Sequence, residues 1–448
     1  MNTKLFGTDG IRAKAGEFPL NAQTLKAIGQ AIGEKVAGKI LVGQDTRMSS
    51  PWIFEHLKAG IAATRSTIED AGVIPTPGVA LLTKTGDYAG GVMISASHNP
   101  YEDNGIKVFA SNGTKVSDAD EAELEKRVHE LIGSATQSVD AIPDQYITRP
   151  HSAGFLERYE EQLLSHFPKG AWLAGMRLVV DCANGATSVV APEILRRLGA
   201  EVVVTNASPN GRNINASCGA VHLDSLIASM KTNSADFGVA FDGDADRSLF
   251  VSRSGRLLDG DAVLLMMARR LKKSGKLNPP VVIGTLMTNF SLERMLREEG
   301  IALTRVAVGD RYVFEEMTRS GALLGGEPSG HVIFPDFRQS GDGLLTTLKV
   351  AEAIVSDHAS FDDLTHDWVQ APQLLKNVRV KQKVPLETLP AVQATMTEVD
   401  HELNGSGRLV VRYSGTEPLL RVMIESDSAD KNERLMNRLL ETIGKNLG

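Results

Sequence analysis

The chain has 448 residues, of which 42% are hydrophobic and 23% are charged, as in a soluble globular protein of about three domains. Its formal net charge of −7 at pH 7 disfavours nucleic acid as the main partner, and no apolar run approaches the length of a membrane helix. The N-terminus lacks the apolar core of a signal peptide, and the two cysteines cannot form a disulfide framework, so we expect a cytoplasmic protein.

Short β-branched runs that end in polar and glycine residues recur along the chain and predict strand–loop–helix units. The first run of each unit lies at residues 40–47, 178–185 and 281–288. A second predicted strand, which leads directly into a polar loop, follows at residues 91–95, 237–241 and 322–326. Apolar runs without alternation are typical of strands buried on both faces of a sheet. Ligands of such sheets bind beyond the carboxyl ends of the strands, where these polar loops fall.

The end of the chain has a different pattern. Its predicted strands are residues 378–381, 409–412 and 421–425, and a helix is predicted at 429–447. We therefore expect an α/β fold of three related α/β domains with mixed sheets plus a smaller C-terminal α+β domain, around a central active-site cleft. The predicted domains are residues 1–152, 153–254, 255–370 and 371–448.

The most informative stretch is Asp242-Gly-Asp244-Ala-Asp246-Arg247, which follows the apolar run 237–241. A strand followed by a tight loop would direct the three carboxylates toward one point. Oxygen ligands of this kind favour a hard divalent cation such as Mg²⁺. A calcium-binding EF-hand loop needs glycine at its sixth position and glutamate at its twelfth, where this chain has Arg247 and Arg253. The loop therefore predicts Mg²⁺ and phosphoryl chemistry.

Two other interpretations of the acidic loop stay open on its residues alone. In the first, Asp242 is the nucleophile of a phosphatase and becomes phosphorylated after a hydrophobic strand. In the second, the loop is a solvated acidic turn. Arg247 argues against the second interpretation, because a fixed cation beside three acids indicates an organised site.

Ser97 lies on the polar loop after the predicted strand 91–95, where a serine is well placed for nucleophilic attack. Its neighbour His98 does not indicate a serine hydrolase, because the loop lacks the G-x-S-x-G motif and adjacent side chains rarely face one another. The alternative for this loop is a capped turn. Lys107 could transfer a proton if burial or other cations lower its pKa, and is otherwise an ordinary surface lysine.

A glycine-hinged loop at residues 326–331 offers the carboxylate of Glu327, the hydroxyl of Ser329 and the imidazole of His331. These groups suit a polyol or an amino sugar, whose hydroxyls need both donors and acceptors. The alternative is a structural turn.

Two arginines, Arg412 and Arg421, flank the turn Ser414-Gly415-Thr416 near the end of the chain. Hydroxyls, backbone N–H groups and guanidinium groups together form a cradle for a dianionic phosphate. A charged hairpin edge is the alternative. At the other end, residues 6–12 form a polar glycine loop with the cation Arg12, which indicates a role near the site or else a plain surface turn.

Together these motifs resemble the α-D-phosphohexomutase superfamily, and the match runs from Phe6 to Arg421. The N-terminal, serine and C-terminal motifs most resemble the bacterial members that interconvert glucosamine 6-phosphate and glucosamine 1-phosphate. Those enzymes act on the route to UDP-N-acetylglucosamine and peptidoglycan. Two positions depart from the pattern of many such members: Ala245 stands in place of glycine in the metal loop, and Pro328 in place of glutamine in the sugar loop. Neither removes a ligand atom.

The resemblance implies a role for each motif. Ser97 would carry the phosphoryl group as a phosphoserine and bind one Mg²⁺ per active site, with Asp242, Asp244 and Asp246. The residues around the transferred group would be Lys107 as a proton shuttle, with Arg247, His98, Arg12 and Arg47. The residues that read the sugar would be Glu327, Ser329, His331, Gly309 and Asp310. The residues that hold the other phosphate would be Arg412, Ser414, Gly415, Thr416 and Arg421.

The implied reaction transfers the phosphoryl group from Ser97 to the sugar, giving a transient bisphosphate that returns its other phosphate to Ser97. A sugar bisphosphate is therefore the expected activator. The expected partner is a small phosphosugar, with no nucleic acid and no membrane, and the oligomeric state is left open, a homodimer included. The alternatives are a phosphomannomutase or phosphoglucomutase, the aspartate-nucleophile phosphatase, and a non-catalytic phosphosugar sensor.

Overall fold

The computed structural model describes residues 4–7, 9–133, 139–144, 153–335, 340–413 and 419–447. The chain forms two compact units, which are described separately here. Unit 1 comprises Met1–Thr285 and Val306–His366, and unit 2 comprises Leu286–Arg305 and Asp367–Gly448. The four predicted domains are finer than these two units, and their limits stay a prediction.

The first sheet of unit 1 has six strands in the order β1-β2-β6-β5-β3-β4. Their bounds are β1 Phe6–Gly7, β2 Gly10–Lys14, β3 Lys39–Gln44, β4 Thr67–Val73, β5 Gly90–Ile94 and β6 Asp103–Ala110. Strand β3 runs parallel to β4 and β5, whereas β6 runs antiparallel to β5 and β2, so the sheet is mixed, as expected. The strands predicted at 40–47 and 91–95 are confirmed as β3 and β5.

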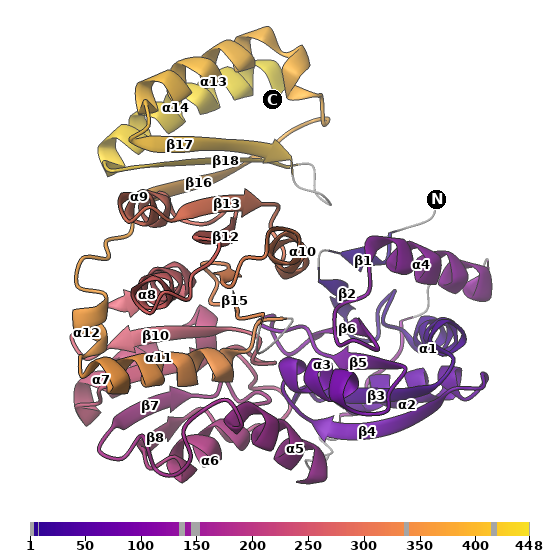
Figure 1. Ribbon diagram of the computed structural model, residues 1–448. Coiled ribbons are helices and arrows are strands. Elements are labelled where there is room, and N and C mark those ends of the chain that lie inside the picture. The colour runs from indigo at the N-terminus through magenta and orange to yellow at the C-terminus, as the bar shows by residue number, and fades with distance from the viewer. Residues whose placement is uncertain are drawn as a thin grey trace. The chain divides into compact units, whose positions relative to one another are not determined.

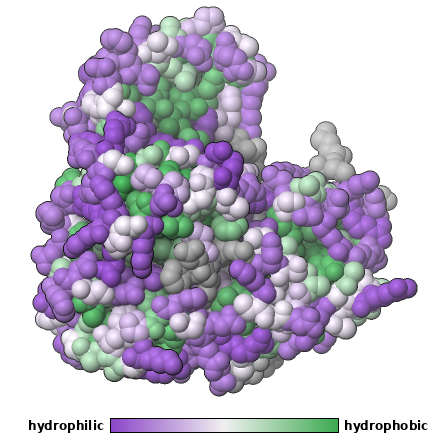
Figure 2. Space-filling view, in the orientation of Figure 1, coloured by the Kyte–Doolittle hydropathy of each residue, from purple (hydrophilic) through white to green (hydrophobic). Residues whose placement is uncertain are grey.

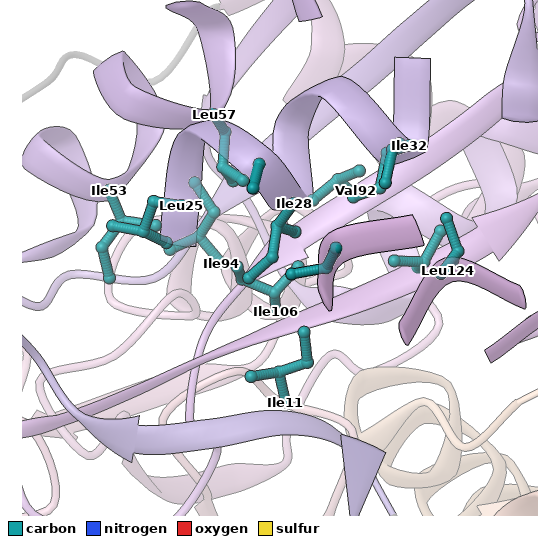
Figure 3. Packing of buried hydrophobic residues seen from close by; sticks show 14 of the residues in the cluster. Ile11, Leu25, Ile28, Ile32, Ile53, Leu57, Val92, Ile94, Ile106 and Leu124 are labelled. Carbon is teal, nitrogen blue, oxygen red and sulfur yellow. The ribbon is translucent and has the colours of Figure 1, made fainter. Parts of the chain in front are cut away.

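Helices cover both faces of this sheet (Figure 1). One face packs against α1 (Ala22–Val36), α2 (Ser50–Ile61) and α4 (Asp118–Ile132) in a core that includes Ile28, Leu57, Val92 and Ile106 (Figure 3). Alternate side chains of a strand point to opposite faces, so the strands have a second face to cover. That face packs against α3 (Thr76–Thr85). Gly43 lets α3 approach closely, since a Cβ there would lie 2.5 Å from a methyl carbon of Val79.

The second sheet of unit 1 has five strands in the order β11-β10-β9-β7-β8. Their bounds are β7 Arg177–Asp181, β8 Glu201–Thr205, β9 Phe237–Phe241, β10 Ser248–Ser252 and β11 Leu257–Leu258. Strand β7 is parallel to β8 and β9, and β10 is antiparallel to β9, so this sheet is also mixed. The helical segments of this part are α5 Ala153–Leu164, α6 Val190–Arg197, η1 Gly219–Val221, α7 Asp224–Asn233, α11 Gly343–Asp357 and α12 Phe361–Leu364. Every residue of β9 is buried, as its continuous apolar run predicted.

The remaining strands of unit 1 are β12 (Val281–Thr285), β14 (Gly325–Gly326) and β15 (Val332–Ile333), which are neighbours in that order. They lie with α8 (Gly260–Lys273) and α10 (Asp310–Ser320). The prediction of a full strand at 322–326 is wrong, because only two of these residues form β14. The backbone turns at once after Gly326, where the N–H of Glu327 donates to the carbonyl of His331 at 2.9 Å.

Unit 2 is the predicted smaller α+β domain with a short preceding segment. Its three-stranded antiparallel sheet has the order β16-β18-β17, with bounds β16 Gln373–Arg379, β17 Gly407–Tyr413 and β18 Leu419–Ser426. Its other elements are α9 Phe290–Glu298, η2 Leu386–Thr388, α13 Pro390–Leu403 and α14 Ala429–Leu447, with β13 (Ala302–Val306) mostly in this unit. Helices α13 and α14 pack on the sheet around Val422, Ile424 and Leu439 (Figure 1). The limits of the strand predicted at 378–381 are wrong, since the strand is Gln373–Arg379. The sequence did not reveal its first residues because this edge strand is largely exposed and lacks a long apolar run.

Hydrophilic side chains cover most of the face of the molecule seen in Figure 2. Among the described helices, none is long and apolar enough to span a membrane. The two cysteines, Cys182 and Cys218, are buried and free, which agrees with the absence of a predicted disulfide framework.

Candidate functional site

The loop after β5 holds Ser97 in a strained backbone conformation. Its φ is +53°, a region that side-chain-bearing residues rarely occupy, and the residue is fully buried. Strain of this kind, of order 1–3 kcal/mol, persists only where surrounding contacts enforce it, and it is frequent at functional sites. The Ser97 hydroxyl donates to Asp242 Oδ2 at 2.5 Å and lies 3.2 Å from His98 Nδ1.

Contacts from two other segments enforce this conformation. The buried guanidinium of Arg47 donates to the carbonyl oxygens of Ser97 and Asn99 at 2.9 and 2.8 Å. The side-chain amide of Asn215 donates to the same two carbonyls. The N–H of Ser97 donates to the hydroxyl of Ser95 at 2.9 Å. The predicted supporting residue Arg47 therefore lies beneath the serine loop.

The loop between β9 and β10 brings the predicted carboxylates together. Ligand oxygens of Asp242, Asp244 and Asp246 lie within 4.8 Å of one another, and all three residues are buried. Burial, and then the neighbouring carboxylates, raise the pKa of Asp242 well above its usual range. Such a concentration of buried negative charge is stable when cations neutralise it.

These carboxylates fit a divalent metal ion. Among the described residues, no hydrogen bond reaches Asp244 Oδ1 or Asp246 Oδ1, although both atoms are buried. Asp246 Oδ1 has the longer ion-pair contacts with Arg247 at 3.7 Å and His331 at 3.9 Å. A buried oxygen without a hydrogen bond is costly, and a hard cation satisfies it directly. The Ser97 hydroxyl is hydrogen-bonded to Asp242, so every atom available here to bind a metal ion is an oxygen. The buried triad can therefore bind a metal, as predicted.

Lys107 on β6 reaches the same loop, and its pKa is shifted upward, so it is an ammonium that holds a proton beside the site. Its ammonium lies 2.9 Å from Asp244 Oδ2, 3.1 Å from Asp246 Oδ2 and 3.2 Å from Asp9 Oδ2. Burial by itself lowers the pKa of Lys107, but the three carboxylates outweigh burial and raise this pKa well above its usual value. The alternative of a surface lysine is wrong, because the side chain is buried. The lowered pKa that the sequence analysis set as the condition for proton transfer is not found, and the role of Lys107 as a proton shuttle stays a prediction.

The other residues predicted near the transferred group lie around Ser97. Arg247 contacts His98, with 3.3 Å between its guanidinium nitrogen and His98 Nδ1, and Arg12 forms an ion pair with Asp9. Burial, and then the charge of Arg247, lower the pKa of His98 to about 4, so its imidazole is neutral at pH 7. Neutral His98 and charged Arg247 therefore lie side by side at the serine.

The predicted sugar loop connects β14 to β15 and contacts the start of α10. The carboxylate of Glu327 accepts the N–H of Gly309 at 3.1 Å, and His331 Nε2 lies 3.5 Å from Asp310 Oδ2. His331 Nδ1 lies 3.9 Å from Asp246 Oδ1. Thus the sugar loop, the start of α10 and the metal loop meet in unit 1, and all five predicted sugar residues lie on these segments.

The predicted phosphate cradle belongs to unit 2. Arg412 on β17 and Arg421 on β18 are directly opposed in the sheet register. Burial, and then the charge of Arg421, lower the pKa of Arg412, so two cations lie together and favour an anion. Ser414, Gly415 and Thr416 lie outside the described residues.

Four residues of this region were missed as site residues by the sequence interpretation. Asp9 bridges Lys107, Arg12 and Lys115, and Thr76 donates its hydroxyl to Asp244 Oδ2 at 2.6 Å. Lys115 and Asn215 are the other two missed residues. Asp9 lies inside the N-terminal motif and could have been included. The other three carry no motif that points to this chemistry, although the stretches around Lys115 and Asn215 are polar, and only the fold brings them to the site.

Ala245 has φ of +61°, so the metal loop carries a left-handed residue, as the serine loop does at Ser97. We expect Ala245→Gly to change the free energy of unfolding by less than about 1 kcal/mol, because relief of the left-handed strain offsets the added freedom of the unfolded chain. Ala240→Gly, in the buried strand β9, lacks that relief and should destabilise by about 1–2 kcal/mol. Denaturant titration of both variants checks the difference. Equal losses would contradict it.

Comparison with known proteins identifies the fold and the family. The chain matches four consecutive domain families of phosphoglucomutase/phosphomannomutase: alpha/beta/alpha domain I at residues 3–132, domain II at 154–255, domain III at 259–371 and the C-terminal domain at 375–442. A solved structure of a phosphoglucomutase/phosphomannomutase family protein from Burkholderia thailandensis superposes with a TM-score of 0.80. That protein is 23% identical, over 100% of this chain and 99% of the other.

Curated relatives are much closer in sequence. One from Solibacter usitatus, named phosphoglucosamine mutase, is 45% identical over 100% of both chains. Another of the same name, from Koribacter versatilis, is 43% identical over 99% of this chain and 97% of the other. Since the four domain families match in order and these relatives match over the full length, the chain belongs to the phosphoglucomutase/phosphomannomutase family.

Proposed function

We propose that this chain interconverts glucosamine 6-phosphate and glucosamine 1-phosphate through phosphorylated Ser97 and a bisphosphorylated sugar. The observation that carries this proposal is the buried hydrogen bond of 2.5 Å between the Ser97 hydroxyl and Asp242, within a cluster of three buried carboxylates that can hold a metal ion. The name and full-length similarity of the curated relatives support glucosamine as the sugar. The product would supply UDP-N-acetylglucosamine, a precursor of peptidoglycan, in the cytoplasm.

The transfer exchanges one phosphorus–oxygen bond for another. The bond between Ser97 Oγ and phosphorus breaks as a hydroxyl oxygen of the sugar bonds to phosphorus, so the sugar hydroxyl gives up one proton and the released Ser97 oxygen takes up one. In the second half the other phosphate of the bisphosphate returns to Ser97, whose hydroxyl gives up its proton, and the sugar oxygen that loses phosphorus takes up one. Lys107, a buried ammonium beside the metal loop, is our candidate for returning that proton. Arg247 adds fixed positive charge beside the reacting serine.

The metal that we assign to the triad is one Mg²⁺, because its donors are carboxylate oxygens and the phosphate of phospho-Ser97 would join them. When bound, Mg²⁺ supplies positive charge beside the transferring phosphoryl group. We assign recognition of the sugar to Glu327, Ser329, His331, Gly309 and Asp310, and retention of the other phosphate to Arg412, Ser414, Gly415, Thr416 and Arg421. A sugar bisphosphate would activate the enzyme by phosphorylating Ser97.

A direct comparison of sugars tests the proposal. The phosphates of glucosamine, glucose and mannose are assayed side by side with Mg²⁺ and the matching bisphosphate. We expect kcat/KM for glucosamine phosphate to exceed the others by about tenfold, which corresponds to about 1.4 kcal/mol. A preference for glucose or mannose phosphate would overturn the choice of sugar but not the phosphoserine chemistry. Steady release of inorganic phosphate without isomerisation would instead support the aspartate-nucleophile phosphatase.

A further inference from the structure

Lys115 is a largely buried cation that the catalytic proposal does not use. It lies on the turn that follows β6 and forms an antiparallel bridge with Phe109. Opposed residues of an antiparallel pair share a face, and so do strand residues two apart, so Lys115 lies on the same face as Lys107. Its side chain is 13% exposed. The local backbone therefore directs this ammonium toward the site rather than into solvent.

The ammonium of Lys115 joins two carboxylates from distant parts of the chain. It forms an ion pair with Asp9 and lies 2.8 Å from Asp310 Oδ1 and 2.7 Å from Asp310 Oδ2. Asp9 also pairs with Lys107, which reaches the metal loop. Lys115 is thus the cation that connects the metal side of the site to the first residue of α10.

The start of α10 in turn holds the sugar loop, because the N–H of Gly309 donates to the carboxylate of Glu327 at 3.1 Å. His331 Nε2 lies 3.5 Å from Asp310 Oδ2 but accepts the N–H of Gly341 at 2.8 Å, so the link from α10 to the loop is the bond to Glu327. A second contact fixes the same end of the helix, since Arg311 donates to the carbonyl of Val116 at 3.1 Å. Two contacts therefore join the two segments: Lys115 of the first binds Asp310 of the second, and Arg311 of the second binds the Val116 carbonyl of the first.

We infer that Lys115 is a positioning residue for sugar recognition: by binding Asp310 it fixes the start of α10, and so holds Gly309 and Glu327 in place. This inference rests on the proposed function and deepens it. Lys115 contacts neither Ser97 nor the metal aspartates among the contacts of the described residues. Its effect is therefore on binding of the sugar and on the choice between sugars, whereas phosphoryl transfer to and from Ser97 remains intact.

The test compares Lys115→Met with Lys115→Arg in the full-length enzyme. We expect Lys115→Met to raise KM for glucosamine phosphate about tenfold, to change kcat less than about threefold, and to reduce the preference over glucose phosphate. Lys115→Arg keeps the charge and should restore most of the preference. Lys126→Met, on the exposed face of α4, is the matched control and should leave both constants unchanged. Phosphorylation of Ser97 by the sugar bisphosphate, read by intact mass, should proceed in every variant.

An unchanged KM and preference in Lys115→Met would overturn the inference, and so would a loss confined to kcat. If Lys115→Met does not fold because Asp310 is left unpaired, Lys115→Met combined with Asp310→Asn removes the unpaired charge. If Lys115 acts through Asp310, the double variant should have the same KM and sugar preference as Asp310→Asn alone, because the effects of two contacting residues are not additive. If the two substitutions instead changed KM and preference independently, so that their effects added, the inference would be overturned. A wild-type enzyme without activity on any hexose phosphate would instead refute the proposed function.

Discussion

Replacing Ser97 with alanine is expected to lower turnover by at least about 10⁴-fold, because the variant lacks the oxygen that carries the phosphoryl group. The three aspartates remain, so Mg²⁺ should still bind, which calorimetry can measure independently of activity. Intact mass after incubation with the sugar bisphosphate provides the second measurement. Wild type should gain one phosphoryl group, and Ser97→Ala none.

Ser95→Ala is the matched control for this experiment. The Ser95 hydroxyl accepts the N–H of Ser97 and donates to Asp45, so its removal loosens the same loop and leaves the nucleophile in place. We expect a loss of about tenfold with phosphorylation retained. If Ser97→Ala were phosphorylated and active to the same degree as Ser95→Ala, the nucleophile would lie elsewhere, and Asp242 would become the leading candidate.

The chemistry of the metal loop could be predicted from sequence because its ligands are local. Asp242, Asp244 and Asp246 follow one buried strand, and a strand that ends in a tight loop leaves few other directions for their side chains. The same reasoning placed Ser97 after β5. That Ser97 lies against Asp242 was implied only by the family resemblance and not by any local pattern, because the two residues come from different sheets.

The environment of Lys107 shows what local reasoning could not provide. A strand residue in β6 could face a helix, solvent or a site, and the sequence does not distinguish these cases. The structure places three carboxylates around it, one of them Asp9 from the N-terminal loop. Their charge reverses the direction of the pKa shift that burial alone would cause, so its sign depends on contacts between residues far apart in sequence.

The predicted limits of strands β14 and β16 were wrong for a related reason. The exposed edge strand β16 has a mixed burial pattern, so its first residues resemble a loop in sequence. In β14 the apolar run is present, but the turn after Gly326 stops the pairing. A continuous apolar run predicts a strand well only where both faces are covered, as in β9.

Asp244→Asn is expected to lower kcat by about 10²–10⁴-fold and to weaken Mg²⁺ binding, because one negative charge is removed from the metal site. Asp244 Oδ1 accepts no hydrogen bond from the described residues, whereas Oδ2 accepts bonds from Thr76 and Lys107. The amide is nearly isosteric, so it can keep one of these bonds but brings an N–H toward cations. Calorimetric titration with Mg²⁺ and the mutase assay measure the two effects separately.

Asp236→Asn is the matched control, because Asp236 lies at the other end of β9 and pairs with Arg253 at the surface. We expect its kcat and Mg²⁺ affinity to stay within about threefold of wild type, since an exposed ion pair contributes little. Full activity of Asp244→Asn at low Mg²⁺ would show that the triad does not hold the catalytic metal. If saturating Mg²⁺ restored its kcat completely, Asp244 would bind the metal without shaping the transition state. A loss that persists at saturation, beside intact binding of the sugar phosphate, is the result that the geometry of the three carboxylates requires.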